Sequence, residues 1–172
     1  MGAGDILNGL QGLLRGESEV DRFLAELKAA FQVRHAFVLS SGKAALTAVL
    51  QALHSRRPER SEVLIPAYTC YSVPSSVVQA GLQVRLADVN PATLDFDFSS
   101  LQESLRPADR LLAVVCPHLF GLPADVNRIK SALPDPEIAL IEDAAQAMGG
   151  IANESFLGTQ SDVGFFILCR GK

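Results

Sequence analysis

Short runs of apolar residues, each too brief for a helix, recur along this chain and end in polar or turn-forming residues. The run Ile138–Ile141 is followed at once by Glu142 and Asp143. Continuous apolar runs of this length are typical of strands that are buried on both faces of a parallel sheet. Strands are expected at 36–39, 62–66, 84–89, 111–116, 138–141 and 163–168, and helices at 18–31, 44–53, 77–80, 98–105 and 125–133. This alternation predicts an α/β fold, with a mostly parallel sheet and helices on both of its faces.

The pattern changes near His35 and divides the chain into two parts. Residues 1–34 predict an N-terminal helical arm, because apolar residues recur there at spacings of three and four, as expected for one face of a helix. The members of this stripe are Val20, Phe23, Leu24, Leu27 and Phe31. Residues 35–172 contain all the strand-like runs and therefore predict the α/β domain.

Charge and composition argue against several classes of partner. The chain has 15 basic and 19 acidic residues, a net charge of −4, which gives no broad positive surface for nucleic acid. Its basic cluster, Arg56, Arg57 and Arg60, is interrupted by Glu59 and Glu62. No apolar run approaches the ~18 residues that a membrane span needs. The three cysteines lack Cys-x-x-Cys or zinc-ligand spacing, so we expect reduced thiols, no metal site and a cytoplasmic protein.

Glu142 and Asp143 directly follow the 138–141 run, at the carboxyl end of the expected strand. In open α/β sheets, ligands bind outside the carboxyl ends of the strands. Neighbours on an extended chain point to opposite faces, so we expect one carboxylate to face a ligand and the other to point away. A paired-carboxylate acid/base site is therefore not expected. Asp143 has an alternative role as a helix N-cap, with Gln146 three residues later.

The sequence Ser40-Ser41-Gly42-Lys43 joins a strand-like run to a helical segment. A strand, a glycine-containing turn and a helix start present backbone N–H groups to an anion. A P-loop is not supported, because Phe37 stands where its first glycine belongs and Ala44 replaces the hydroxyl residue that binds magnesium. A phosphate monoester at this turn and plain capping of the helix remain the two alternatives.

Three features fall at the same edge of the expected sheet: the Gly42 turn, Asp143, and Lys172 beyond the 163–168 run. They suit pyridoxal phosphate, with its phosphate at the helix start, a carboxylate that keeps the ring nitrogen protonated, and a lysine that forms the Schiff base. Taken alone, Asp143 could be a helix N-cap and Lys172 could be an ordinary exposed lysine. The three features together, in this order and each at a strand end, favour a cofactor site. A Rossmann-like dinucleotide site would need a Gly-x-Gly-x-x-Gly turn between a strand and a helix, which is absent.

Six segments in this order resemble the first part of the DegT family, the fold type I, pyridoxal phosphate-dependent nucleotide-sugar aminotransferases. They are residues 40–46, 62–66 with Tyr68-Thr69, 81–88, 117–125, 141–147, and 161–166 with Gly171-Lys172. The resemblance implies an enzyme that passes an amino group, from glutamate, to a nucleotide-linked keto-sugar in polysaccharide or glycoside biosynthesis. It also implies a homodimer with its active site at the subunit interface.

The resemblance further implies roles for individual residues. Asp143 would pair with the pyridine nitrogen, and Gln146 would contact the side of the ring that carries the oxygen. Gly42 and Lys43 would bind the phosphate through their backbone N–H groups. Lys172 would be the catalytic Schiff-base lysine and would move protons. The related sugar dehydratases have histidine at this position, so the lysine argues against that class of enzyme.

The chain departs from the family pattern at several positions. Lys43 stands at a usual threonine, Ile167 at a phosphate-binding serine, and Cys70 at the aromatic residue that stacks on the ring; Tyr71, or else Tyr68, is the candidate to replace that aromatic. Ile167 and Cys70 favour an alternative function, a non-catalytic relic or binding module that keeps the fold without the cofactor. His118 matches a family histidine, for which a direct role and a hydrogen-bonded position at a strand end are both open.

Family members continue past the lysine with the rest of the large domain and a small domain. With Lys172 as the last residue, residues 35–172 would form an incomplete cofactor-binding large domain. Catalysis is sensitive to misplacement of a reacting group by about 1 Å. We therefore expect the 172-residue chain alone to be inactive or nearly so.

Overall fold

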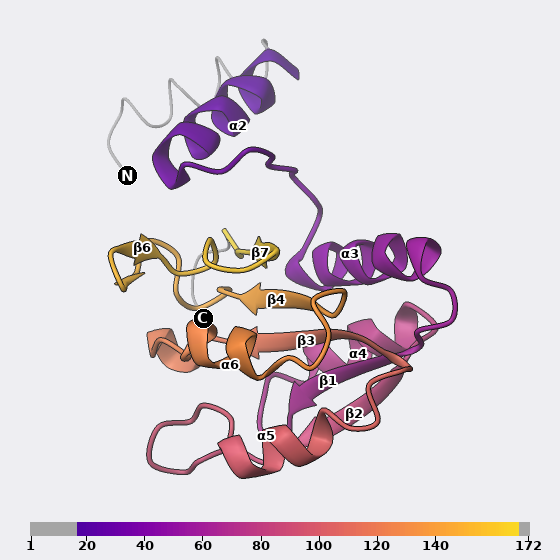
Figure 1. Ribbon diagram of the computed structural model, residues 1–172. Coiled ribbons are helices and arrows are strands. Elements are labelled where there is room, and N and C mark those ends of the chain that lie inside the picture. The colour runs from indigo at the N-terminus through magenta and orange to yellow at the C-terminus, as the bar shows by residue number, and fades with distance from the viewer. Residues whose placement is uncertain (1–16, 169–172) are drawn as a thin grey trace. The chain divides into compact units, whose positions relative to one another are not determined.

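The computed structural model describes residues 17–168 (Figure 1). The chain divides into two compact units, Met1–Val38 and Leu39–Lys172. In the first unit, helix α2 (Glu17–Phe31) confirms the expected helix. Its surface carries an ion pair one turn apart, in which Arg22 Nε lies 3.0 Å from Glu26 Oε1. Within residues 17–168, none of the helices has both the length and the apolar character that crossing a bilayer requires.

The second unit is built on a five-stranded sheet with the order β2-β1-β3-β4-β7. Its strands are β1 (Glu62–Pro66), β2 (Gln83–Ala87), β3 (Leu111–Pro117), β4 (Ala139–Asp143) and β7 (Val163–Phe165). All four neighbouring pairs run parallel. Every residue of the central strand β3 is buried, which explains its continuous apolar sequence. The expected parallel α/β fold is confirmed.

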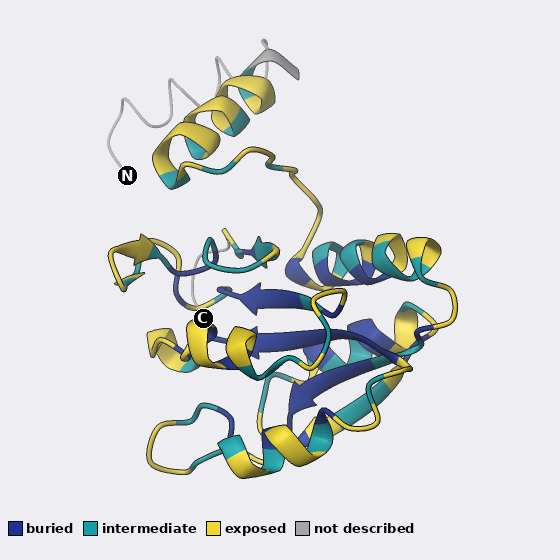
Figure 2. Cartoon of the chain, viewed as in Figure 1, coloured by how far each residue is buried: buried dark blue, intermediate teal, exposed yellow. Residues whose placement is uncertain are grey.

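Helices cover both faces of this sheet (Figure 1). On one face lie α3 (Gly42–Arg56) and α4 (Ser72–Gln79), and on the other α5 (Phe98–Ser104) and α6 (Val126–Ala132). The sheet separates two apolar cores, so successive residues of β1 enter different ones: Val63 and Ile65 pack with α3 and α4, and Leu64 with α5 and α6. Figure 2 shows the buried strands between helices with exposed outer faces.

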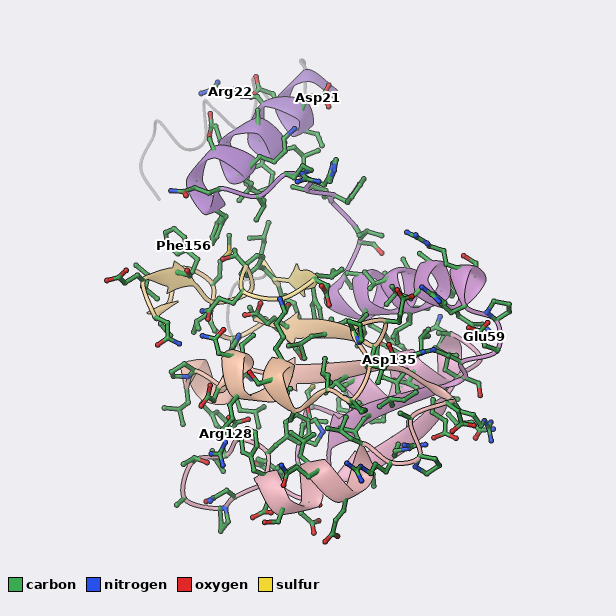
Figure 3. All side chains as sticks on the ribbon, in the orientation of Figure 1. Asp21, Arg22, Glu59, Arg128, Asp135 and Phe156 are labelled. Carbon is green, nitrogen blue, oxygen red and sulfur yellow. The ribbon has the colours of Figure 1, made fainter. Side chains whose placement is uncertain are left out.

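A cation–π contact adds to the packing of α5 against α6. The guanidinium of Arg128 lies 3.6 Å from the centre of the Phe98 ring, and Arg128 is labelled in Figure 3. At the opposite end of the strands from the active-site edge, Arg60 donates to the carbonyl of Leu111 and pairs with Asp135, which is also labelled. Arg60, a member of the interrupted basic cluster, therefore has a structural role.

The strand expected at 36–39 is wrong. Residues 35–39 form no strand, and the side chain of Phe37 is 81% exposed. This segment lies where the two units meet in the sequence, and within residues 17–168 no strand pairs with it. An apolar sequence alone does not make a strand, because the backbone N–H and C=O groups need a neighbouring strand as partner. Of the strand expected at 163–168, only Val163–Phe165 forms a strand, which is β7.

A short hairpin between β4 and β7 was not expected. Strands β5 (Ile151–Ala152) and β6 (Ser155–Phe156) pair antiparallel. The two residues between them, Asn153 and Glu154, both have positive φ, 50° and 62°, as a type I′ turn requires. Sequence reasoning had little to detect, because the strands have two residues each and the usual Asn-Gly is Asn-Glu here.

Candidate active site

An open pocket lies at the carboxyl ends of β3, β4 and β7, where the helix α3 begins. It contains about 490 Å³ of space that no protein atom fills, and part of this space is open solvent. Four of the residues expected at the site line it together: Gly42, Lys43, Asp143 and Gln146. Tyr71 is not among the lining residues, and its side chain is 85% exposed. Lys172 lies outside the described residues.

The start of α3 presents unpaired backbone donors to the pocket. Ser41 caps the helix, and its Oγ accepts a hydrogen bond from the Ala44 N–H at 3.1 Å. The remaining N–H groups of a first helical turn have no acceptor within the helix, and they form its positive end. Gly42 and Lys43 belong to this turn and line the pocket, so an anion placed here would meet both backbone donors and positive potential.

Ile167 packs closely against this helix start. A Cβ atom added to Gly42 would lie 2.7 Å from Ile167 Cδ1 and 2.8 Å from Cγ1, so only glycine fits at position 42 without movement of the isoleucine. Ile167 is half-buried and lines the pocket. The residue that replaces the usual serine therefore forms an apolar wall beside the expected phosphate position.

Asp143 and Glu142 point in opposite directions, as expected for neighbours on a strand. Asp143 lines the pocket and is 8% exposed. Its Oδ1 accepts a hydrogen bond from the Ala145 N–H at 3.1 Å. The segment that follows is a turn and not a helix, so the alternative role of Asp143 as a helix N-cap is wrong. The short turn instead holds the carboxylate at the end of β4.

Glu142 is fully buried on the other side of β4 and is saturated with hydrogen bonds. Its carboxylate accepts from the N–H groups of Gly158, at 2.8 Å, and Gln160, at 2.7 Å, and its Oε2 lies 3.0 Å from His118 Nε2. Burial alone raises the pKa of this carboxyl, but hydrogen bonds led by the one from His118 outweigh that effect and hold the pKa below its usual value. Glu142 is therefore a structural carboxylate that attaches residues 158–160 to the sheet.

His118 follows β3 and is 1% exposed. Its Nδ1 accepts a hydrogen bond from the Ala124 N–H at 3.1 Å, so the ring hydrogen is on Nε2 and is donated to Glu142. Both ring nitrogens are thus engaged within the protein. Of the two roles open for His118, these contacts support the hydrogen-bonded position at a strand end.

Two cysteines lie near the site in different environments. Cys116 in β3 is completely buried, and burial, with smaller effects from nearby carboxylates led by Asp95, raises the pKa of its thiol well above the usual value. It is an unreactive core residue. Cys70 lines the pocket, and its Sγ accepts a hydrogen bond from Ser72 Oγ at 3.1 Å. Cys70, which stands where the family has an aromatic residue, therefore lies in the pocket itself.

Phe120 was missed by sequence reasoning. Its backbone N–H donates to Gln146 Oε1 at 2.7 Å and so joins the loop after β3 to the turn after β4. Phe120 has φ +56°, a left-handed conformation that is uncommon for an aromatic residue. The following Gly121 was the only local signal of an unusual turn, and it does not reveal a contact with a side chain so far along the sequence.

Comparisons with known proteins agree with this geometry. The model of the DegT/DnrJ/EryC1/StrS aminotransferase family matches residues 5–168. L-glutamine:2-deoxy-scyllo-inosose aminotransferase from Streptomyces kanamyceticus is 32% identical over 95% of this chain and 38% of that protein. GDP-perosamine synthase from Vibrio cholerae is 27% identical over 86% of this chain and 39% of that protein.

Solved structures give the same result. An aminotransferase from Psychrobacter cryohalolentis superposes with a TM-score of 0.84 at 25% identity, over 96% of this chain and 42% of that one. The E. coli GDP-4-keto-6-deoxy-D-mannose-3-dehydratase with bound hydrated PLP gives 0.78 at 26% identity, over 90% of this chain and 42% of that one. The chain thus spans about two fifths of the length of these relatives. Since the family model matches almost all of its residues, the chain belongs to the DegT/DnrJ/EryC1/StrS aminotransferase family.

Proposed function

We propose that this chain supplies the cofactor-binding part of a pyridoxal phosphate-dependent aminotransferase that acts on a nucleotide-linked keto-sugar. One observation carries the proposal: the start of α3 and the Asp143 carboxylate line the same pocket at the carboxyl edge of the sheet. The names of the relatives support it, since they include an aminotransferase that uses L-glutamine and a synthase of a GDP-linked amino sugar. Glutamate as the amino donor, a cytoplasmic homodimer and a place in polysaccharide or glycoside biosynthesis are parts of the same proposal.

The residues present fit the cofactor at both of its charged ends. The first turn of α3 offers backbone donors for a phosphate, and Lys43 is the only cationic side chain among the described residues of the pocket lining. Asp143 offers a largely buried carboxylate for a protonated ring nitrogen. The bound cofactor would act as an electron sink for the carbon that gains or loses the amino group.

The side chains divide into those that touch the ligand and those that position others. Gly42 and Lys43 bind the phosphate, Asp143 keeps the ring nitrogen protonated, and Gln146 lies beside the ring. Lys172, beyond the described residues, is the proposed catalytic lysine. His118 lines the pocket, but both of its ring nitrogens are hydrogen-bonded within the protein, as is the Glu142 carboxylate, so neither residue is a hydrogen-bond partner for the ligand.

Equilibrium dialysis with pyridoxal phosphate and with pyridoxal tests this function. The full chain should bind the phosphorylated form at least about tenfold more tightly, because hydrogen bonds to a charged group contribute about 1.5–3 kcal/mol. Borohydride reduction should then attach the cofactor to Lys172, which peptide mass spectrometry would detect. Equal affinity for the two compounds, or no binding of either, would contradict the proposal.

The alternative of a binding module without the cofactor rests on Ile167 and Cys70, which both line the pocket, and the Ile167 side chain also packs on the helix start. Replacing Ile167 with serine should raise the affinity for pyridoxal phosphate about three- to tenfold, because one hydroxyl donor adds about 1 kcal/mol. The affinity for pyridoxal should not change. Leu168→Ser is the matched control, since Leu168 is the next residue and is 59% exposed. If neither the unaltered chain nor Ile167→Ser binds pyridoxal phosphate, the cofactor-free alternative is favoured.

A further inference from the structure

Strand β2 is the outermost strand at one side of the five-stranded sheet. The hydrogen bonds of the Gln83 N–H and of the Ala87 carbonyl run to residues next to the two ends of β1. Because the backbone groups of successive residues in a strand point to opposite sides, the N–H and C=O groups of residues 84, 86 and 88 point away from β1. These groups form the outer side of β2, where a further strand would pair.

Helix α5 lies beside β2 and supplies partners for its outer side (Figure 1). Ser104 Oγ donates to the outward Leu86 carbonyl at 2.9 Å. Ser100 Oγ accepts from the outward Asp88 N–H at 2.8 Å. In a parallel ladder, a single residue of a neighbouring strand would donate to the first of these groups and accept from the second. The two hydroxyls therefore take the place of one residue of a further strand.

The spacing of residues along α5 explains why these hydroxyls reach β2. Leu101 and Leu105, four positions apart, are buried in the core on this face of the sheet. Ser100 and Ser104 each precede one of these leucines, so they form a second stripe about 100° around the helix from the first. The apolar stripe packs under the sheet, and the hydroxyl stripe faces the outer side of β2.

Both ends of α5 are also bonded to β2 and to the residue that follows it. At the start of the helix, Asp97 Oδ1 accepts from the Ser100 N–H at 3.0 Å, and the Asp97 N–H donates to the outward Asp88 carbonyl at 2.9 Å. At the end of the helix, the Arg85 guanidinium donates to the Ser104 carbonyl at 3.0 Å, one of the carbonyls that a helix leaves without an internal partner. The helix is therefore held along the side of β2 and not only against the face of the sheet.

We propose that α5 is an edge cap, which occupies the outer side of β2 and prevents the β2 strands of two copies of this chain from pairing. The inference goes beyond the proposed function and does not depend on the cofactor. A second copy presents the same strand, and two identical strands can pair around a two-fold axis. Within residues 17–168, no hydrogen bond joins the outward groups of Val84 to another element, and Leu86 is 56% exposed. Without the cap, this apolar strand would be open to pairing.

Replacing both Ser100 and Ser104 with alanine tests the cap, because alanine removes the two hydroxyls and favours the helix. Sedimentation velocity at several concentrations should show an association constant about tenfold higher than that of the unaltered chain, the effect of one or two further hydrogen bonds between copies. Ser99→Ala is the matched control on the same helix and should not change association, since Ser99 is exposed. Adding Leu86→Pro to the double variant should restore the original constant, because this proline removes an outward N–H and none toward β1.

Hydrogen exchange at the Asp88 amide is a second measurement, which needs no association. This amide should exchange about tenfold faster in Ser100→Ala than in the unaltered chain or in Ser99→Ala. An unchanged exchange rate, an association constant that does not rise in the double variant, or a rise that Leu86→Pro does not reverse would overturn the inference. The affinity for pyridoxal phosphate should be the same in all these variants, because none of the substituted residues lines the pocket, so failure of the proposed function would be seen separately.

Discussion

Replacing Glu142 with glutamine should lower the free energy of unfolding by about 2–4 kcal/mol, the largest loss of stability that we expect from an isosteric change in this chain. The carboxylate accepts from two backbone N–H groups and from His118 in a fully buried position. A glutamine in its place turns one accepting oxygen into a donor that faces another donor. Urea unfolding followed by circular dichroism would measure the loss. Glu103→Gln is the control, because Glu103 is exposed and should change stability by less than about 0.5 kcal/mol.

The same substitution should change how stability depends on pH. The pKa of Glu142 is lower in the folded protein than its usual value of 4.5. Its contribution to stability is therefore fully present above about that value and is lost as the pH falls through the folded pKa. The difference in unfolding free energy between the unaltered chain and Glu142→Gln should be constant from pH 7 to 5 and should shrink below pH ~4. A difference that stays the same in acid would show that the lost stability has another origin.

Replacing Asp143 with asparagine should lower the affinity for pyridoxal phosphate about 100-fold or more. Asp143 is only 8% exposed, and the loss of one partner from a buried, hydrogen-bonded ion pair costs about 3–5 kcal/mol. The substitution should leave the fold intact, because an asparagine oxygen can still accept the Ala145 N–H. Equilibrium dialysis would measure the affinity, and thermal unfolding would verify the fold.

The control for this experiment is Asp109→Asn, a change of the same chemistry at an exposed position outside the pocket lining. It should bind pyridoxal phosphate as the unaltered chain does. If Asp143→Asn also keeps its affinity, the carboxylate does not face the ring nitrogen. The pocket would then need another explanation.

The parts of the fold that could be predicted are those governed by local pattern. Strands β1, β3 and β4 are buried on both faces, so their apolar runs are continuous and their existence follows from the sequence; the bounds of β1 are as expected, whereas β3 extends one residue and β4 two residues beyond the expected carboxyl end. The opposite directions of Glu142 and Asp143 follow from the geometry of any strand. The placement of Gly42 and Asp143 at one edge follows because the strands of the five-stranded sheet run parallel.

The parts that could not be predicted depend on contacts between distant residues. Glu142 is structural because Gly158 and Gln160 lie beside β4 and donate to its carboxylate. Phe120 matters because its N–H donates to Gln146. Neither contact can be inferred from the local sequence. The error at 36–39 has the same origin, because pairing and not composition decides whether an apolar run becomes a strand. The position of Tyr71 outside the pocket lining also depends on how α4 begins, which no motif specifies.

The contact between Gly42 and Ile167 makes these two distant positions share a single volume. A larger residue at 42 requires the Ile167 side chain to move, whereas a smaller residue at 167 relieves the contact without any change at Gly42. The order in which the two substitutions occur therefore affects their cost, and a path of sequence change that begins at position 167 avoids the contact that the reverse path must relieve.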